Sequence, residues 1–319
     1  DCPAQMAYNI KKGEAGSMAK AAWIAQRTDA RLVRALFPVR KRDTHKGDYG
    51  KVLLLCGSEG LTGAARLAAK AALRCGSGLV YLGVPEKIYP IVAAGAGSEI
   101  VFPLPCDGEG RLNLAAFEPI AERMAQMDAV LLGPGLGRSD ELTALCIRLV
   151  QTCRAPLVLD ADGINALAAH MDVLHGSACP KVLTPHGGEF LRLGGDPLSR
   201  DPVSEAMRIS RESGAIVLLK GCRTIITDGK NVYRNTTGNP GLATGGSGDV
   251  LAGMIVSLLG QHVMPLEAAA AAAWLHGAAA DAAAGELGEY SLLPEDVLRT
   301  LPRLLKKTGE FACGEALPY

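Results

Sequence analysis

The sequence has few aromatic residues, no excess of charge of either sign and no long hydrophobic run. Phe, Trp and Tyr make up 4% of the 319 residues, which disfavours a surface that stacks nucleic-acid bases. Lys and Arg together number 33, as do Asp and Glu, so the chain lacks the basic excess typical of proteins that bind nucleic acid or anionic membranes. No apolar stretch reaches the roughly 18–20 residues of a membrane span. With 48% hydrophobic residues, the composition is nevertheless typical of a folded globular protein.

Nine cysteines are present, but none forms a Cys-x-x-Cys pair or a Cys/His spacing that suits a metal. An odd number without a disulfide framework indicates a reducing compartment, so we expect a cytoplasmic protein. Cys56, Cys75 and Cys222 lie within or beside apolar segments, where a free thiol behaves as a small hydrophobic group. Lys11 and Lys12 interrupt the start of the chain, which does not resemble a signal peptide.

The middle of the chain alternates short apolar runs with segments of helical spacing. Apolar runs of strand length occur at Val52–Cys56, Leu79–Val84, Ala129–Leu132, Pro156–Leu159, Lys181–Leu183 and Ile216–Leu219. Helical spacing occurs at Gly63–Cys75, Ser139–Thr152 and Val203–Ser213, and at residues 248–260, 265–286 and 294–305. Two further β-like runs, 224–228 and 231–234, predict a hairpin. Continuous apolar strands alternating with helices predict an α/β domain, with a mainly parallel sheet covered by helices on both faces.

We divide the chain into three parts. Residues 1–30 form an N-terminal extension, in which Gly16-Ser17-Met18 is either the remnant of an expression tag or the end of a lost domain. Residues 31–308 contain no linker rich in Pro or Ser and are predicted to fold as one domain. Residues 309–319 form a C-terminal tail.

The segment Asn239–Gly253 carries the strongest functional pattern. Gly245, Gly246 and Gly248 directly precede an apolar helix that begins near Asp249. Glycines let successive N–H groups converge, and the helix N-terminus adds partial positive charge, so this turn suits a phosphate or a phosphoryl group in transfer. A carboxylate repels phosphate, so the useful role of Asp249 is to accept a proton from an attacking hydroxyl. The alternative is an ordinary Asp in the first turn of a helix.

Two other loops also follow predicted strands. Gly133–Gly137 resembles part of the dinucleotide motif G-x-G-x-x-G, but Arg138 occupies the place of the third small residue. This loop therefore allows close approach without identifying a ligand. In Thr184–Glu189, a His and a Glu three residues apart could position a substrate or a magnesium-bound water, or could simply begin the next helix.

Four segments carry weaker patterns. Lys220–Thr224 begins with a lysine at the end of a strand, which can meet a phosphate or remain solvated. Asp160–Asn165 could bind a metal through water or cap a helix. The small residues of Gly57–Ala65 allow either a ligand or a second helix to approach. The basic cluster Arg40–Lys46 is most simply a solvated face. Ligands of open α/β sheets bind outside the carboxyl ends of the strands, where several of these loops are expected.

Taken in order, these segments resemble the NAD(P)H-hydrate dehydratase family of the ribokinase-like superfamily. The matching segments are His45–Gly50, Gly63–Ala65, Gly133–Gly137, Leu159–Asp162, Leu183–Glu189, Leu218–Gly221 and Thr237–Gly253. The Thr-Pro-His-x-Gly-Glu form separates this family from sugar and vitamin kinases, whose motif usually begins with Asn. The resemblance implies a ribokinase-like three-layer αβα sandwich without the β-lid of sugar kinases.

The resemblance also implies an activity. NADH and NADPH become hydrated at C6 of the nicotinamide ring, and this family dehydrates the S epimer at the expense of ADP in most bacterial members or ATP in eukaryotic ones. The C6 hydroxyl would be phosphorylated and phosphate then eliminated, so the protein would be a lyase that repairs a metabolite. Mg²⁺ would bridge the phosphates of the nucleotide.

The family pattern assigns roles to particular residues of this sequence. Asp249 would be the catalytic base. The hydrate would contact Ala64, Ala65, Gly135, His186 and Asp249. The nucleotide would lie along Lys220, Gly221, Cys222, Arg223 and Thr224 and against Gly248. An anion hole would consist of Gly245, Gly246, Ser247 and Gly248. Glu189 would hold the metal ion through water.

Other functions remain as alternatives. A vitamin-precursor kinase of the same superfamily, or a nucleotide sensor without turnover, would share the Gly-rich loop, although a sensor would not need Asp249. An oxidoreductase is disfavoured by the failed dinucleotide motif. The resemblance also suggests a homo-oligomer, often a tetramer, and an epimerase acting upstream, which the 30 leading residues are too few to contain. No motif chooses between ADP and ATP or between the hydrates of NADH and NADPH.

Overall fold

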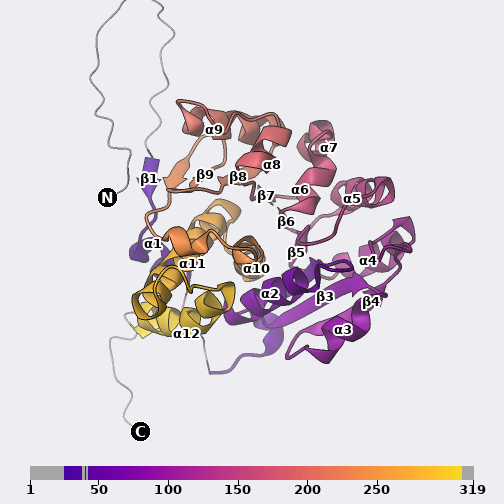
Figure 1. The fold of residues 1–319 in the computed structure, drawn as a ribbon, viewed down its shortest axis with the longest axis horizontal. Helices are drawn as coiled ribbons and strands as arrows, with labels where there is room; N and C mark the ends of the chain where they lie inside the picture. Colours follow the sequence, from indigo (N-terminus) through magenta and orange to yellow (C-terminus); the bar gives the residue numbers. More distant parts are fainter. Residues whose placement is uncertain (1–24, 38–39, 41, 311–319) are drawn as a thin grey trace, which may run out of the picture.

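The apolar runs of the sequence form one ten-stranded sheet in the computed structural model, which describes residues 25–37, 40 and 42–310 (Figure 1). The strands are β1 (Ala25–Arg27), β2 (Lys51–Leu55), β3 (Leu79–Pro85), β4 (Ile100–Leu104), β5 (Ala129–Leu132), β6 (Leu157–Leu159), β7 (Lys181–Leu183), β8 (Ile216–Leu219), β9 (Ile225–Thr227) and β10 (Val232–Arg234). They lie in the order β1-β10-β9-β8-β7-β6-β5-β2-β3-β4. Strand β9 is antiparallel to β8 and β10, and the other pairs are parallel.

Helices cover both faces of this sheet. They are α1 (Ala30–Leu36), α2 (Thr62–Arg74), α3 (Tyr89–Ala94), α4 (Phe117–Met124), α5 (Asp140–Thr152), α6 (Asp162–Leu167), α7 (Met171–Gly176), α8 (Gly187–Arg192), α9 (Pro202–Ser213), α10 (Ser247–Gly260), α11 (Pro265–Leu287) and α12 (Pro294–Glu310). Short 3-10 turns occur at η1 (Lys46–Tyr49), η2 (Leu114–Ala116) and η3 (Pro240–Leu242). Helices α1, α2 and α10–α12 pack on one face, and α4–α9 lie on the other (Figure 1). The predicted α/β sandwich is therefore confirmed.

The central strands are apolar at every position because both of their faces are buried. In β2, Val52 and Leu54 belong to the core beneath α2 and α10, whereas Leu53 and Leu55 belong to the core beneath α4 and α5. All four side chains are fully buried. Continuous runs of this kind are typical of parallel sheets that are covered on both sides.

Helices α2 and α10 approach unusually closely. Helix α2 buries five alanines, and a Cβ at Gly253 of α10 would collide with the backbone carbonyl of Ala68. The small residues that follow β2 therefore serve helix packing, which was one of the two interpretations of that segment. This packing holds the middle of α10 against α2.

The two edge strands, β1 and β4, were not among the strands expected from the sequence. Strand β4 contains Pro103, which cannot donate to a ladder and is tolerated at an edge. Strand β1 lies inside residues 1–30, so the sheet begins before the expected boundary at residue 31. It pairs with β10, and the Thr28 hydroxyl donates to Asn235 Oδ1 at 2.9 Å. The hairpin expected at 224–234 is present as β9 and β10.

Within the described residues, no helix combines the length and the apolar character needed to cross a membrane.

Candidate active site

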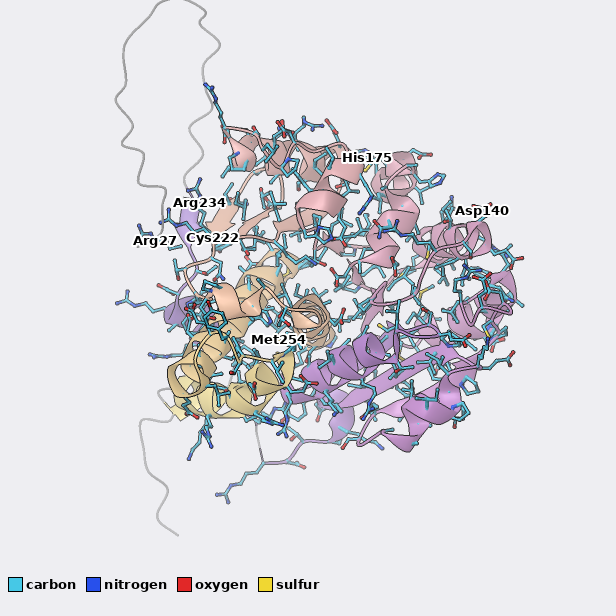
Figure 2. All side chains as sticks on the ribbon, viewed as in Figure 1. Arg27, Asp140, His175, Cys222, Arg234 and Met254 are labelled. Atoms are coloured by element: carbon cyan, nitrogen blue, oxygen red, sulfur yellow. The ribbon has the colours of Figure 1, made fainter. Side chains whose placement is uncertain are left out.

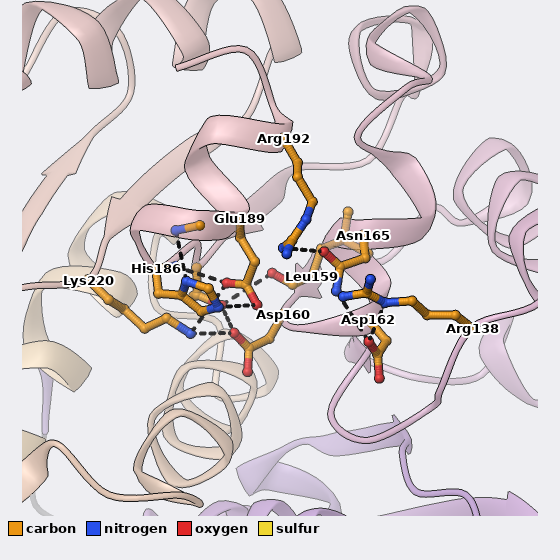
Figure 3. Close-up of polar contacts among 11 residues, drawn as sticks. Arg138, Leu159, Asp160, Asp162, Asn165, His186, Glu189, Arg192 and Lys220 are labelled. Carbon is orange, nitrogen blue, oxygen red and sulfur yellow. Dashed lines mark hydrogen bonds and ion pairs between the residues drawn. The ribbon is translucent and has the colours of Figure 1, made fainter. Parts of the chain in front are cut away.

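A buried lysine–aspartate pair lies where three neighbouring strands end. Asp160 follows β6, Thr184 follows β7 and Lys220 follows β8. The Nζ of Lys220 is 2.9 Å from Asp160 Oδ1, and the Thr184 hydroxyl donates to the same oxygen at 2.7 Å (Figure 3). Burial by itself lowers the pKa of Lys220, but the carboxylates of Asp160 and Glu189 raise it above its ordinary value. The lysine is therefore charged and fixed in orientation.

His186 and Glu189 lie beside this pair at the start of α8. The Glu189 carboxylate is buried, accepts from the His186 backbone N–H at 2.9 Å and lies 3.9 Å from Lys220 Nζ. The His186 ring contacts Glu189 Oε1 through Nε2 at 3.2 Å, while its Nδ1 accepts from the Gly188 N–H (Figure 3). These residues therefore begin the helix, as one interpretation predicted, and also face the lysine–aspartate pair.

The Gly-rich segment forms the N-terminus of α10. Gly246 is the N-cap residue, with φ of +95°, and a Cβ there would lie 2.6 Å from Leu67 Cδ1. A Cβ at Gly248 would lie 3.3 Å from Lys220 Nζ, so the first turn of α10 approaches the ammonium group directly. The free N–H groups of a helix N-terminus, together with an adjacent cation, make a site for an anion.

The carboxyl group of Asp249 has a raised pKa. Its pKa is raised from its ordinary value of 3.8 to about 7, first by burial and then by the negative charge of Asp160. Lys220 opposes this rise, and Asp162 adds to it. A carboxyl group with a pKa near neutrality is suited to accept and release a proton.

Asp162 organises the neighbouring loop. Its Oδ2 accepts from the Gly137 N–H at 2.9 Å, and its Oδ1 accepts from Asn165 Nδ2 at 3.2 Å. Arg138 lies 3.6 Å from the same carboxylate, and Arg192 donates to Asn165 Oδ1 (Figure 3). Asp162 is thus engaged by loop and helix groups, whereas Asp160 faces the lysine.

A cavity of about 1150 Å³ opens beside the N-terminus of α10. Its lining residues are Arg27, His186, Lys220–Thr224, Arg234–Pro240, Leu242–Thr244, Ser247, Gly248, Leu251, Ala273, His276 and Gly277. Arg27, Cys222 and Arg234 lie near one another on this side of the molecule (Figure 2). The cavity therefore combines cationic side chains with a helix N-terminus.

The structure brings together only part of the predicted site. His186, all of Lys220–Thr224, Ser247 and Gly248 line the cavity, while Asp249 and Glu189 lie next to Lys220. Ala64 and Gly135 approach each other outside the lining, since a Cβ at Gly135 would lie 3.0 Å from Ala64 Cβ.

One expectation was wrong, and one residue is less accessible than expected. The side chain of Ala65 is fully buried. Cys222 does not behave as a buried hydrophobic group, because it is exposed on the loop after β8. Gly245 is exposed and has no atom near its Cβ position, whereas Gly246 is enclosed by Leu67 and Pro294.

Sequence reasoning missed His276 in the Ala-rich helix α11. Its ring is 7% exposed, and burial followed by the charge of Lys220 lowers its pKa to about 4, so it is neutral. Its Nε2 and the Ser247 hydroxyl are buried atoms without a hydrogen-bond partner in the described structure. A single histidine among alanines gives no sequence signal, because only the approach of α11 to α10 brings it near the loop.

Magnesium fits this site only with help from a bound molecule. No cluster of three or more His, Cys, Asp or Glu side chains suited to a metal occurs among the described residues. Mg²⁺ usually binds one or two carboxylates and completes its shell with water and phosphate oxygens. Asp160 and Glu189 supply two carboxylates facing the anion site, which matches that preference.

The chain matches known proteins over most of its length. Residues 52–303 match the family model described as NAD(P)H-hydrate dehydratase. Over 282 residues the chain is 45% identical to the bifunctional NAD(P)H-hydrate repair enzyme of Moorella thermoacetica, covering 87% of this chain and 53% of that enzyme. The enzyme of the same name from Escherichia coli is 34% identical over 88% of this chain and 52% of its own length. The chain thus spans about half the length of these relatives.

Solved structures show the same similarity. The ADP/ATP-dependent NAD(P)H-hydrate dehydratase of Bacillus subtilis, co-crystallised with ATP and Mg²⁺, superposes with a TM-score of 0.78 and 31% identity. The match covers 90% of this chain and 100% of that one. A hydroxyethylthiazole kinase from Pyrococcus horikoshii shares the fold, with a TM-score of 0.59, 17% identity, and coverage of 86% of this chain and 92% of the kinase.

Proposed function

This chain belongs to the NAD(P)H-hydrate dehydratase family, and we propose that it converts the S epimer of hydrated NADH or NADPH back to the reduced cofactor at the expense of ADP or ATP. The observation that carries the proposal is Asp249, whose pKa is raised to about 7 at the first turn of α10. Bacterial relatives named for this repair support the substrate class, and the ATP/Mg²⁺ complex of the Bacillus subtilis protein supports a nucleotide donor.

Asp249 is the proposed catalytic base. Hydroxide leaves poorly, so the C6 hydroxyl is first phosphorylated and the phosphate then departs. The carboxylate accepts the hydroxyl proton as the oxygen attacks the phosphoryl group, and a base whose pKa lies near the working pH does this efficiently. The N–H groups of Gly245, Gly246, Ser247 and Gly248 stabilise the charge of the phosphoryl group in transfer.

The nucleotide occupies the cavity beside Lys220–Thr224 in this proposal. Its phosphates point to Gly248 and Lys220, which approach each other at the N-terminus of α10. Arg27 and Arg234 line the same cavity and favour a polyanion. The hydrate then lies against Ala64 and Gly135, which are outside the lining of this cavity, and against His186, which also lines it.

Asp160 and Glu189 are the residues that would hold magnesium, Glu189 through water. When bound, the ion neutralises charge on the nucleotide phosphates. The chain's own contribution is Lys220, which neutralises the same region and is held in place by Asp160.

A cytoplasmic location is also part of the proposal. The seven cysteines within the described residues are free thiols, which suits a reducing compartment.

The test is to incubate the protein with a mixture of hydrate epimers and Mg²⁺, with ADP or ATP in parallel, and to follow the absorbance of reduced nicotinamide. We expect recovery that requires a nucleotide, stops at the S fraction and releases phosphate. A phosphorylated product that keeps its hydroxyl-derived oxygen would instead identify a kinase. No turnover by protein that binds nucleotide would identify a sensor. The Asp249→Asn variant is the matched control for contaminating activity.

A further inference from the structure

Two arginines from different elements converge on α6 at the carboxyl edge of the sheet. Arg138 follows the Gly133–Gly137 loop, and Arg192 is the last residue of α8. The Nε of Arg138 lies 3.6 Å from Asp162 Oδ1. The Nη1 of Arg192 donates to Asn165 Oδ1 at 2.9 Å. The amide of Asn165 in turn donates to Asp162 Oδ1 at 3.2 Å, so both guanidinium groups approach one polar pair (Figure 3).

Most N–H donors of these two arginines are not used within the protein. A guanidinium group has five such donors. Among the described residues, the side chain of Arg138 makes one ion pair and that of Arg192 makes one hydrogen bond. Both residues are exposed, and the side chain of Arg138 is 64% exposed. The backbone of Arg138 is nevertheless fixed, because Arg111 Nη1 donates to its carbonyl oxygen at 2.9 Å. Both arginines are therefore anchored while presenting further donors to solvent.

Both arginines lie near the contacts proposed for the hydrate. Gly135 is three residues before Arg138, a separation of at most about 11 Å. His186 is the N-cap residue of α8. The six residues that follow it place Arg192 about 9 Å farther along the helix axis. The two arginines are therefore within the length of a dinucleotide from the surface that would hold its nicotinamide.

The surrounding charges indicate what these arginines can bind. Asp160 and Glu189 are buried carboxylates that lie 2.9 and 3.9 Å from Lys220 Nζ. The pyrophosphate of a dinucleotide carries two negative charges, so carboxylates repel it and guanidinium groups attract it. Two guanidinium groups and the carboxylate of Asp162 together leave one positive charge at α6. Guanidinium groups also bind phosphate oxygens through paired N–H donors.

We propose that Arg138 and Arg192 bind the pyrophosphate of the hydrated dinucleotide, and so select whole dinucleotides over smaller hydrated nicotinamides. This inference rests on the proposed function. Each guanidinium keeps its contact with α6 and offers its remaining N–H donors to the phosphate oxygens. The arginines determine specificity and do not touch the C6 hydroxyl, so they increase affinity for the hydrate without taking part in proton or phosphoryl transfer.

The experiment compares two hydrates in Arg138→Gln and Arg192→Gln. One is the S hydrate of NADH, and the other is the corresponding hydrate of reduced nicotinamide riboside, which has no phosphate. Glutamine keeps a polar side chain but removes the charge. In each variant we expect the KM for the NADH hydrate to rise about tenfold, because a hydrogen bond to a charged group is lost. The kcat, the KM for the nucleotide and the kcat/KM for the riboside hydrate should stay unchanged.

Arg148→Gln is the matched control. Arg148 is a partly exposed arginine of α5, and it contacts the ring of Phe117 and the carboxylate of Glu118. Its replacement removes the same charge from another surface, so the kinetic constants for both hydrates should stay unchanged. An equal rise of the KM for the NADH hydrate in this variant would mean that only the overall charge matters, and would overturn the proposal.

Two other results would also overturn it. One is an unchanged KM for the NADH hydrate in both site variants. The other is an equal loss for both hydrates together with a lower Tm, which would show that the arginines only hold α6 in place. Failure of the proposed function differs from these results, because the unaltered protein would then not turn over either hydrate. Titration calorimetry with NADH would decide the inference in that case. It requires NADH binding by the unaltered protein and about tenfold weaker binding by each site variant, with ADP affinity unchanged.

Discussion

Lys220 and Asp160 are sixty residues apart in the chain, and their side chains meet at 2.9 Å beneath the N-terminus of α10. Both influence the acidity of Asp249, but in opposite directions. The carboxylate of Asp160 raises the pKa of Asp249, and the ammonium of Lys220 lowers it. Burial is the largest cause of the raised pKa of Asp249, and this pair adjusts the pH at which Asp249 becomes available as a base.

Replacing Asp160 and replacing Lys220 should move the acidic limb of the pH profile in opposite directions. Asp160→Asn removes a negative charge and should move the limb of kcat/KM to lower pH by about one unit, while the loss of a proposed magnesium ligand lowers the height of the whole profile. Lys220→Met should move it to higher pH by a similar amount. The measurement is kcat/KM for the hydrate between pH 5 and 9. Arg208→Met, which removes ion pairs on the distant helix α9, is the control and should leave the limb in place. Shifts of the same sign in both site variants would contradict this electrostatic account.

Asp249→Asn should abolish turnover while preserving nucleotide binding. An amide cannot accept the hydroxyl proton, and loss of a positioned base costs at least about 100-fold in rate. Titration calorimetry should give a nearly unchanged nucleotide affinity, and the absorbance assay should give the rate. Turnover within a few-fold of the unaltered protein would remove Asp249 from the mechanism.

The same variant should be more stable than the unaltered protein at high pH. The pKa of Asp249 rises from 3.8 to about 7 on folding, so ionisation of this group disfavours the folded state. This penalty is absent below the unfolded pKa, grows as pH rises from about 4 to about 7, and is constant above that. Urea unfolding at pH 5 and pH 8 should show that the stability gained by Asp249→Asn is larger at pH 8. An equal gain at both values would mean that the carboxyl group is not strained by burial.

Gly246→Ala should destabilise the protein by about 1–3 kcal/mol. The residue has φ of +95°, and the added Cβ would meet Leu67 Cδ1 at 2.6 Å. Gly245→Ala is the matched control for stability, because its φ is not left-handed and nothing lies within 4 Å of the added atom. Thermal unfolding of both variants tests the difference. Equal losses would show that the turn tolerates a side chain at its N-cap.

His186→Ala should raise the KM for the hydrate more than the KM for the nucleotide. The ring also caps α8 by accepting from the Gly188 N–H, so alanine removes two interactions at once. His186→Asn keeps a side chain able to cap the helix but removes the imidazole. If both variants raise the hydrate KM and only alanine lowers Tm, the ring contacts the substrate. A change confined to the nucleotide KM would exchange the two proposed subsites.

Most of the sheet was predictable because local pattern and burial agree there. Three strands have the predicted bounds: Ala129–Leu132, Lys181–Leu183 and Ile216–Leu219. Continuous apolar runs are typical of strands in a sheet that is covered on both faces. The edge strands were not predictable in this way. Residues 25–27 are short and acquire strand geometry by pairing with β10, more than two hundred residues away.

The sequence by itself determined the alternation of strands and helices, and with it the gathering of the Gly-rich and charged loops at the carboxyl edge of the sheet. It also supplied Asp249 and the turn before it, because a run of glycines before an apolar helix has a local physical meaning. Only the tertiary structure decided that Lys220 pairs with Asp160 and that the side chain of Ala65 is buried. These facts depend on which elements become neighbours, and an acidity such as that of Asp249 depends on how much water its neighbours exclude.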